Sequence, residues 1–162
     1  MEKAKQLRLK YKIAMADGNL FSNETLKLNR ANLLVFYKRS CPTCTMFLPY
    51  LTDYLNRFEQ PPGGIFLISQ DSLDTTLSFI KENAIKIPVV IDTPDYRLSR
   101  LLNLDTVPAF YLLSASGELR QSFQGFFRDE VIEMMANFEN LNKISHQPFF
   151  QNLRGIPVLV PG

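Results

Sequence analysis

The chain is 162 residues long, 46% of them hydrophobic, and carries a formal net charge of +2. This length and apolar content suit a single α/β domain with a core of ordinary size. Because the charge is nearly balanced and forms no long run of one sign, we expect neither a nucleic-acid partner nor binding to an anionic membrane.

The first 18 residues are rich in charged side chains and lack the apolar core of a secretion signal. Apolar residues recur in them at helical spacing, namely Leu7, Tyr11, Ala14 and Met15. We therefore expect a short amphipathic helix that ends near Gly18. No apolar stretch approaches the length of a membrane span. The sequence as given predicts a cytoplasmic protein, and a periplasmic or other extracytoplasmic one if a leader has been removed.

A strand, a tight turn and a helix follow a connection formed by residues 19–31. The apolar run Leu33–Tyr37 predicts a buried strand over residues 32–37. Helical spacing then continues to about residue 58, in Met46, Phe47, Tyr50, Leu51, Tyr54 and Leu55. Pro49 lies inside that helix and should kink it, because proline lacks an N–H and its ring crowds the preceding turn.

The turn holds the sequence Cys41-Pro42-Thr43-Cys44, which contains both cysteines of the chain. The sulfurs fall at the helix start, where unpaired N–H groups and the helix dipole favour a thiolate over a thiol. Pro42 suits the first helical turn, where no hydrogen bond is lost. Lys38 and Arg39 precede the motif and either help to stabilise the Cys41 thiolate or are solvated loop residues. The pattern predicts a redox-active cysteine pair.

Cysteine counting argues against two other uses of this pair. A structural zinc site needs four ligands, whereas the chain offers two cysteines and one distant histidine, His146. A disulfide that serves only stability would gain little, because so small a ring removes little entropy from the unfolded chain. We therefore expect thiol chemistry with no metal and no organic cofactor.

The rest of the chain alternates strands and helices and ends in a tail with apolar residues that should lie against the body. The predicted elements are a breaker at 60–64, a strand at 65–68, a helix at 73–83 capped by Asp71 or Ser72, a strand at 88–91, a helix at 95–102, a hairpin at 109–123, a helix at 128–141 and a tail at 145–162.

This order of elements, together with four motifs, resembles the thioredoxin superfamily and, within it, the TlpA/ResA-like thiol–disulfide oxidoreductases, which are related to the redoxins. The motifs are Cys41–Cys44, Pro49, Ile87–Asp92 and Thr106–Phe110. The resemblance covers residues 32–141. It implies an α/β, thioredoxin-like fold in which helices flank a central mixed β-sheet, with an added N-terminal helix and an inserted helix–strand unit around Pro88.

The domain division that follows has three parts. They are the N-terminal helix and connection at 1–31, the thioredoxin-like domain at 32–144, and the C-terminal tail at 145–162, packed on the domain.

The resemblance also gives Pro108 a role beyond opening a strand, which proline does readily. In thioredoxin-like proteins the corresponding proline has a cis peptide bond and packs beside the CxxC sulfurs. The backbone of Val107 would then face an open groove and pair with the substrate, with Pro42 and Thr43 completing the substrate-binding surface. The borders expected for this groove are Tyr37, Pro42 and Phe126.

Three positions depart from the family pattern. Ser40 replaces the tryptophan before the first cysteine, Val35 replaces the buried aspartate of thioredoxin, and Phe47 replaces the glutamate common in TlpA-like proteins. The group that accepts the proton of Cys44 is therefore unassigned from nearby sequence. Carboxylates that could reach the site by folding are Asp92 and Asp105.

Taken together, these features predict a thiol–disulfide oxidoreductase in which Cys41 attacks a protein disulfide and Cys44 resolves the mixed disulfide. Its partners would be protein disulfides or dithiols and an unidentified redox protein, and we expect a monomer. Two alternatives stay open, a non-catalytic thioredoxin-like interaction module and a thiol peroxidase. The peroxidase pattern calls for threonine and proline where this chain has Lys38 and Leu34, and copper delivery would call for CxxxC spacing.

Overall fold

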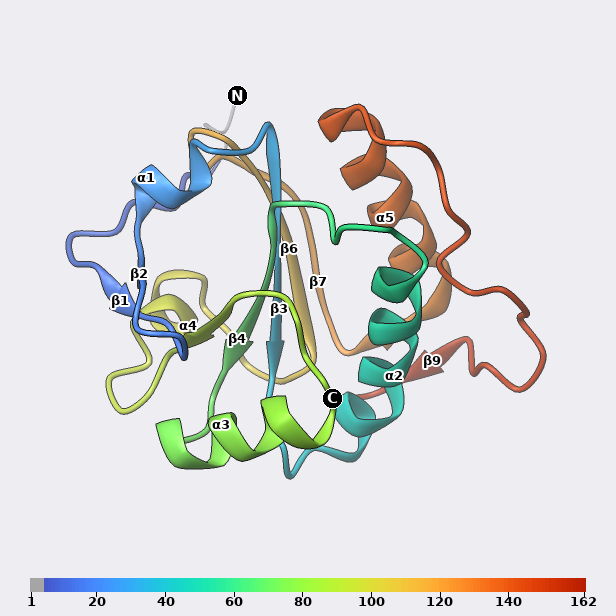
Figure 1. The fold of residues 1–162 in the computed structure, drawn as a ribbon, viewed down its shortest axis with the longest axis horizontal. Helices are drawn as coiled ribbons and strands as arrows, with labels where there is room; N and C mark the ends of the chain where they lie inside the picture. The colour runs from blue at the N-terminus through green and yellow to red at the C-terminus, as the bar shows by residue number, and fades with distance from the viewer. Residues whose placement is uncertain (1–4) are drawn as a thin grey trace.

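The fold is built around a five-stranded sheet with strand order β5-β4-β3-β6-β7, which Figure 1 shows nearly edge-on. The computed structural model describes residues 5–162. In it the strands of this sheet are β3 (Ala31–Tyr37), β4 (Ile65–Ser69), β5 (Val89–Ile91), β6 (Ala109–Ser114) and β7 (Leu119–Gln124). Strand β4 runs parallel to β3 and β5, whereas β6 runs antiparallel to β3 and β7. The sheet is therefore mixed, as the sequence predicts.

Strand β3 lies at the centre, and all seven of its residues are buried. Because side chains alternate across a strand, Val35 and Tyr37 enter one apolar cluster while Leu34 and Phe36 enter another on the opposite face. The uninterrupted apolar run in the sequence reflects burial on both faces.

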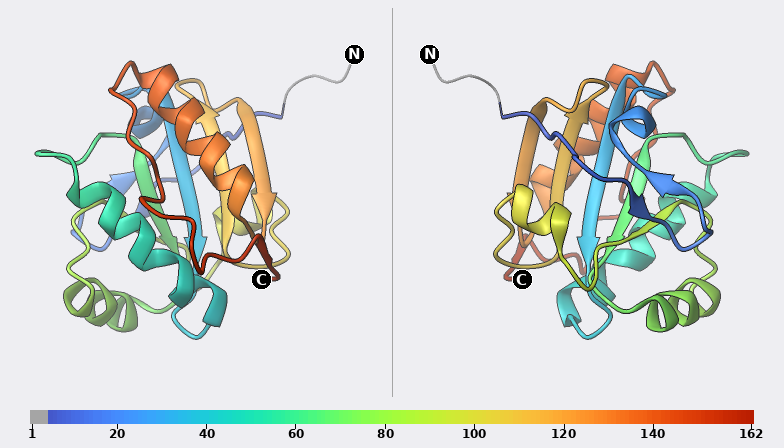
Figure 2. Two further views of the ribbon diagram at one scale, coloured as in Figure 1. Left: turned by 90° about the vertical axis from the view of Figure 1, so that its right-hand side faces the viewer. Right: turned by 90° about the vertical axis from the view of Figure 1, so that its left-hand side faces the viewer.

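Helices cover both faces of the sheet. They are α1 (Asn23–Leu26), α2 (Pro42–Asn56), α3 (Leu73–Glu82), α4 (Arg97–Leu101) and α5 (Arg128–Asn142). Helices α2 and α5 lie side by side over one face, and the N-terminal segment and α4 lie over the other (Figure 2). Ser72 is the N-cap of α3 and accepts a hydrogen bond from the N–H of Thr75. No helix in residues 5–162 has the length and apolar character needed to cross a bilayer.

The prediction of a helix in the N-terminal segment is wrong for residues 5–18, the part of it that the structure describes. This segment is extended and contributes strand β1 (Ile13–Ala14), which pairs with β2 (Leu20–Phe21). Backbone hydrogen bonds tie it to the main domain, from the N–H of Leu7 to the carbonyl of Gly117 at 2.7 Å and from the N–H of Ala16 to the carbonyl of Val89 at 2.8 Å. Residues 1–4, which the predicted helix also covered, lie outside the described residues.

Helix α1 lies within the stretch 19–31 that the sequence suggested as a plain connection. Its N-cap is Ser22, whose side chain and that of Thr25 satisfy each other's backbone in a capping box. A capping box usually has Glu or Gln three residues after the N-cap. Thr25 at that position therefore did not lead to the prediction of a helix.

The C-terminal tail packs along the domain and reaches the N-terminal end of α2. Phe149, Phe150 and Ile156 are buried against the α2–α5 cluster. Strand β9 (Leu159–Val160) then pairs antiparallel with β8 (Phe126–Phe127). Figure 1 shows β9 beside the first turns of α2.

Candidate active site

Cys41 is the N-cap residue of α2, directly after the turn that leaves β3. Its φ of −83° and ψ of 115° are extended, and its sulfur accepts a hydrogen bond from the N–H of Cys44 at 3.2 Å. Pro42 occupies the first helical position, where proline is favoured. The Cys41 sulfur therefore lies where the helix N-terminus stabilises negative charge, and it is partly accessible to solvent.

Cys44 lies one turn further in and is 1% exposed. Burial is the main cause that raises the pKa of the Cys44 thiol, and the hydrogen bond with Cys41 raises it further. No disulfide joins the two cysteines in the structure. The two sulfurs are thus unequal, since one is accessible and the other is buried and held protonated.

The peptide bond between Val107 and Pro108 is cis, which confirms that prediction. The Cys41 thiol donates to the carbonyl oxygen of Val107 at 3.4 Å across 66 positions of sequence. Sheet register explains this approach, because Phe36, near the end of β3, pairs with Ala109, at the start of β6. A second cis bond, at Thr93–Pro94, was not predicted.

Two of the three residues expected to border an open groove beside Val107 cannot do so in the structure. Tyr37 and Phe126 are both 0% exposed, so neither side chain lines an open surface. Pro42 is exposed, as expected, whereas Thr43 is buried. The Thr43 hydroxyl donates to the carbonyl of Pro161 at 2.8 Å, so the tail occupies this place. This contact could not be predicted from the sequence, although the apolar residues of the tail indicated that it packs on the domain.

The two basic residues before the motif have different surroundings. The Arg39 guanidinium pairs with Glu82 of α3 at 2.6 Å, and its backbone N–H donates to Asp71 at 2.8 Å. Lys38 has an exposed side chain, and its backbone carbonyl accepts from the N–H of Cys41 at 3.1 Å. The tuning of the thiolate by these two side chains stays a prediction.

Of the distant carboxylates considered for proton transfer, Asp92 is fully used in structure. Its oxygens accept from the N–H groups of Leu98 and Ser99 and from the Ser99 hydroxyl, which fixes the start of α4. Asp105 is exposed. Asp71, which the sequence suggested only as a possible helix cap, is the carboxylate whose charge contributes to the raised pKa of Cys44.

Across residues 5–162, no group of three or more His, Cys, Asp or Glu side chains is arranged to hold a metal ion.

Solved structures of other proteins share this fold. A thiol-disulfide isomerase from Corynebacterium glutamicum is 18% identical with a TM-score of 0.67, over 86% of this chain and 98% of that chain. A thiol:disulfide interchange protein of Chlorobium tepidum is 20% identical with a TM-score of 0.64, over 88% and 97%. StoA from Bacillus subtilis is 19% identical with a TM-score of 0.60, over 80% and 98%. These likenesses confirm the thioredoxin-like fold.

The family follows from the sequence match. Residues 2–122 match the AhpC/TSA family, and the chain belongs to that family. A comparison with curated proteins finds no match. Family and fold together support the predicted oxidoreductase of thioredoxin type, and they agree with the resemblance to the thioredoxin superfamily.

Proposed function

We propose that this protein is a thiol–disulfide oxidoreductase that exchanges its Cys41–Cys44 dithiol or disulfide with protein disulfides or thiols. The observation that carries the proposal is the placement of Cys41. Its sulfur sits at the N-cap of α2, accepts the N–H of Cys44 and contacts the carbonyl of Val107. A buried second thiol three residues away is then in position to resolve a mixed disulfide.

In the reducing direction, the Cys41 thiolate attacks one sulfur of a substrate disulfide. The new bond is a mixed disulfide, and the other substrate sulfur leaves as a thiolate and takes a proton. Cys44 then loses its proton and attacks the Cys41 sulfur, which releases the second substrate thiolate. The substrate gains two electrons, and the protein is left with a Cys41–Cys44 disulfide. The same steps in reverse oxidise a substrate dithiol.

The protein side of this reaction comes from a single chain. Both sulfurs and the Val107–Pro108 loop belong to one thioredoxin-like domain, so the proposal needs only a monomer. A partner redox protein must return the cysteine pair to its starting state. The compartment of action is cytoplasmic or extracytoplasmic, and the direction of exchange follows from the redox poise there.

Trapping of mixed disulfides tests the proposal. In a Cys44→Ser variant, Cys41 can attack a substrate but the mixed disulfide cannot be resolved, so disulfide-linked adducts should accumulate on non-reducing gels. The matched Cys41→Ser variant should trap none, because Cys44 is 1% exposed. Equal adduct formation by both variants, or none by either, would contradict the assigned roles. A non-catalytic interaction module would give neither variant a covalent adduct.

A further inference from the structure

The last part of the tail crosses the face of the domain that carries the cysteine pair. We call residues Val158–Gly162 the strap. Its strand β9 pairs with β8, in the register Phe126 with Val160 and Phe127 with Leu159. The pairing is extended by a hydrogen bond from the N–H of Arg128 to the carbonyl of Val158 at 2.9 Å.

The strap ends on the two structural parts that surround Cys41. The Thr43 hydroxyl, between the two cysteines, donates to the carbonyl of Pro161 at 2.8 Å. At Gly162 a Cβ atom would lie 2.5 Å from the carbonyl oxygen of Val107 and would also clash with Thr106. That same Val107 carbonyl accepts the hydrogen bond of Cys41. The strap therefore lies against the motif on one side and the cis-proline loop on the other.

The hold on the strap is weaker than the hold on the tail before it. Upstream, Arg57, the C-cap residue of α2, donates to the carbonyls of Pro148 and Phe149, and the Phe149 ring stacks on Phe47 at 5.8 Å. Within the strap, Val158 and Leu159 are 59% and 52% exposed. Only Val160 packs against the apolar cluster.

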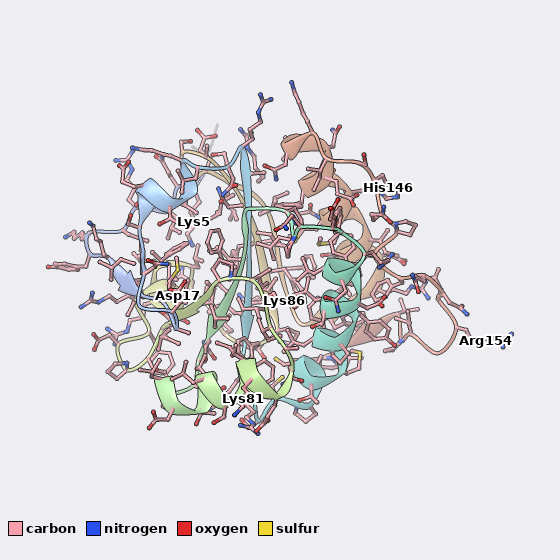
Figure 3. All side chains as sticks on the ribbon, viewed as in Figure 1. Lys5, Asp17, Lys81, Lys86, His146 and Arg154 are labelled. Carbon is pink, nitrogen blue, oxygen red and sulfur yellow. The ribbon has the colours of Figure 1, made fainter. Side chains whose placement is uncertain are left out.

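The anchored part and the strap are joined by a loop that stands away from the body. Residues 151–155 are all exposed, and Figure 3 shows Arg154 at the outer tip of this loop. Gly155 has a φ of +77° and open space around it. Between this loop and the strap, Ile156 is buried with the anchored part of the tail. The strap can therefore leave its place after Ile156 without disturbing Phe149 and Phe150.

We propose that the strap is an internal ligand of the exchange site, which an extended segment of a partner protein displaces by pairing with β8. This inference rests on the proposed function, since it concerns how a partner reaches Cys41. A partner sulfur that attacks or is attacked at Cys41 must bring its own backbone beside Thr43 and Val107, where the strap lies. The two segments compete for one place.

The strap itself indicates the chemistry of the partner segment. Its five residues carry no charged side chain, its two strand residues are apolar, and glycine stands against Val107. A segment that replaces it should be extended, uncharged and apolar at the position of Val160, and small where it meets the Val107 carbonyl. Pairing with β8 would give affinity, and these side-chain limits would give selectivity.

The test compares Val160→Asp with the matched control Val158→Asp. Asp at position 160 would place a charge against the apolar cluster and release the strap, whereas position 158 is 59% exposed and should tolerate it. Gly162→Val is a second releasing variant, which acts through the clash with Val107 instead. None of the three changes replaces a cysteine or a residue of the cis-proline loop.

The first readout is the rate at which Cys41 reacts with a maleimide on a large polyethylene glycol chain, compared with iodoacetamide. Release of the strap should raise the rate with the large reagent about tenfold, the shift expected from lost burial of one valine, and change the iodoacetamide rate little. Val158→Asp should match the parent protein. If the large reagent reacted at equal rates with the parent protein and both releasing variants, the proposal that the strap covers Cys41 would be wrong.

The second readout follows the strap without thiol chemistry. The Arg128 N–H is bonded to the Val158 carbonyl, so its hydrogen exchange should speed up in Val160→Asp and not in Val158→Asp. Unchanged exchange in Val160→Asp would overturn the proposal. If Cys41 did not react even with iodoacetamide, the proposed function would be contradicted instead. The hydrogen-exchange rate of the Arg128 amide would still show whether Val160 holds the strap in place.

Discussion

The unequal surroundings of Cys41 and Cys44 arise from a single helix start. An N-cap residue stands half outside its helix, whereas Cys44 lies inside α2 and belongs to the buried apolar cluster. Cys41 is therefore partly accessible, and Cys44 is 1% exposed with a raised pKa caused mainly by burial. A thiol with a raised pKa is a poor nucleophile until it loses its proton, so resolution by Cys44 should be the step that depends on proton removal.

Asp71 bears on that step through its charge. It contributes to the raised pKa of Cys44, and it accepts the backbone N–H of Arg39 at 2.8 Å. The buried aspartate of thioredoxin is replaced by Val35, which is 1% exposed inside the apolar cluster. The carboxylate whose charge acts on Cys44 is thus that of Asp71, in the loop after β4. Its distance from the cysteines along the sequence gives no indication of this effect.

Tyr37 supplies a prediction about pH. Burial raises its pKa from the usual 10.0 to about 12, and its buried hydroxyl has no hydrogen-bond partner within residues 5–162. The stability tied to this group is therefore complete below pH 10 and is lost as the pH rises through 12. Between pH 10 and pH 12, the free energy of unfolding should therefore fall less in Tyr37→Phe than in the parent protein. The difference between the two falls should reach about 2 kcal/mol at pH 12.

Denaturant titrations at a series of alkaline pH values measure this difference. Near pH 7 the substitution should not lower the free energy of unfolding, because the hydroxyl that is removed is buried without a hydrogen-bond partner among the described residues. Tyr11→Phe, at a tyrosine that is 63% exposed, is the control and should leave the slope unchanged. A Tyr37→Phe protein with the parent slope would show that the phenol does not titrate as its burial requires.

At the level of elements, Glu139 joins two helices and the tail. This carboxylate of α5 is 2% exposed and accepts from the Tyr54 hydroxyl of α2 at 2.7 Å and from the N–H of Gln147 at 2.9 Å. His146 lies 2.7 Å from its other oxygen. In Glu139→Ala the hydroxyl and the N–H would lose their acceptor in a buried place, which should lower the free energy of unfolding by about 2–4 kcal/mol.

Glu133 offers the matched control for that change, since it lies on the exposed face of the same helix. Glu133→Ala should shift the unfolding free energy by less than about 0.5 kcal/mol. Chemical denaturation of both variants measures the contrast. Similar losses in the two variants would mean that the Glu139 hydrogen bonds do not hold the tail to the helices.

Elements with a strong local signal could be predicted, and those that depend on distant pairing could not. The apolar run before Cys41 and the Ser72 cap led to β3 and α3 in the right places. The segment around Leu7 has helical spacing, yet its backbone bonds to Gly117 of the β6–β7 hairpin outweigh local helix propensity. Partners more than a hundred residues away leave no trace in local periodicity.

The same dependence on distant pairing explains which residues of the site could be predicted and which could not. Cys41 and Pro108 each sit in a recognisable motif, and the family resemblance places them together although 66 positions separate Cys41 from Val107. Pro161 belongs to no such motif, so its hydrogen bond with Thr43 could only be seen in the folded chain. The apolar tail predicted packing against the domain but gave no register for it.

On the scale of the whole molecule, the sheet brings the reactive parts to one end. Strand β3 delivers the cysteine motif, β6 begins at the cis-proline loop antiparallel to it, and β8 with the strap closes the third side. Helices α2 and α5 cover the adjoining face and hold the tail through Arg57 and Glu139. The arrangement leaves one partly accessible sulfur on a domain that is otherwise well packed around it.

The most direct test of the central claim is equilibration of the reduced protein in glutathione buffers of graded composition, followed by acid quenching, alkylation and mass spectrometry. The account predicts that Cys41 and Cys44 convert together, in a reversible two-electron step, to an intramolecular disulfide. The midpoint would also give the direction of exchange in either compartment. A protein that forms no Cys41–Cys44 disulfide in any buffer, or that stops as a stable glutathione adduct on Cys41, would contradict the account.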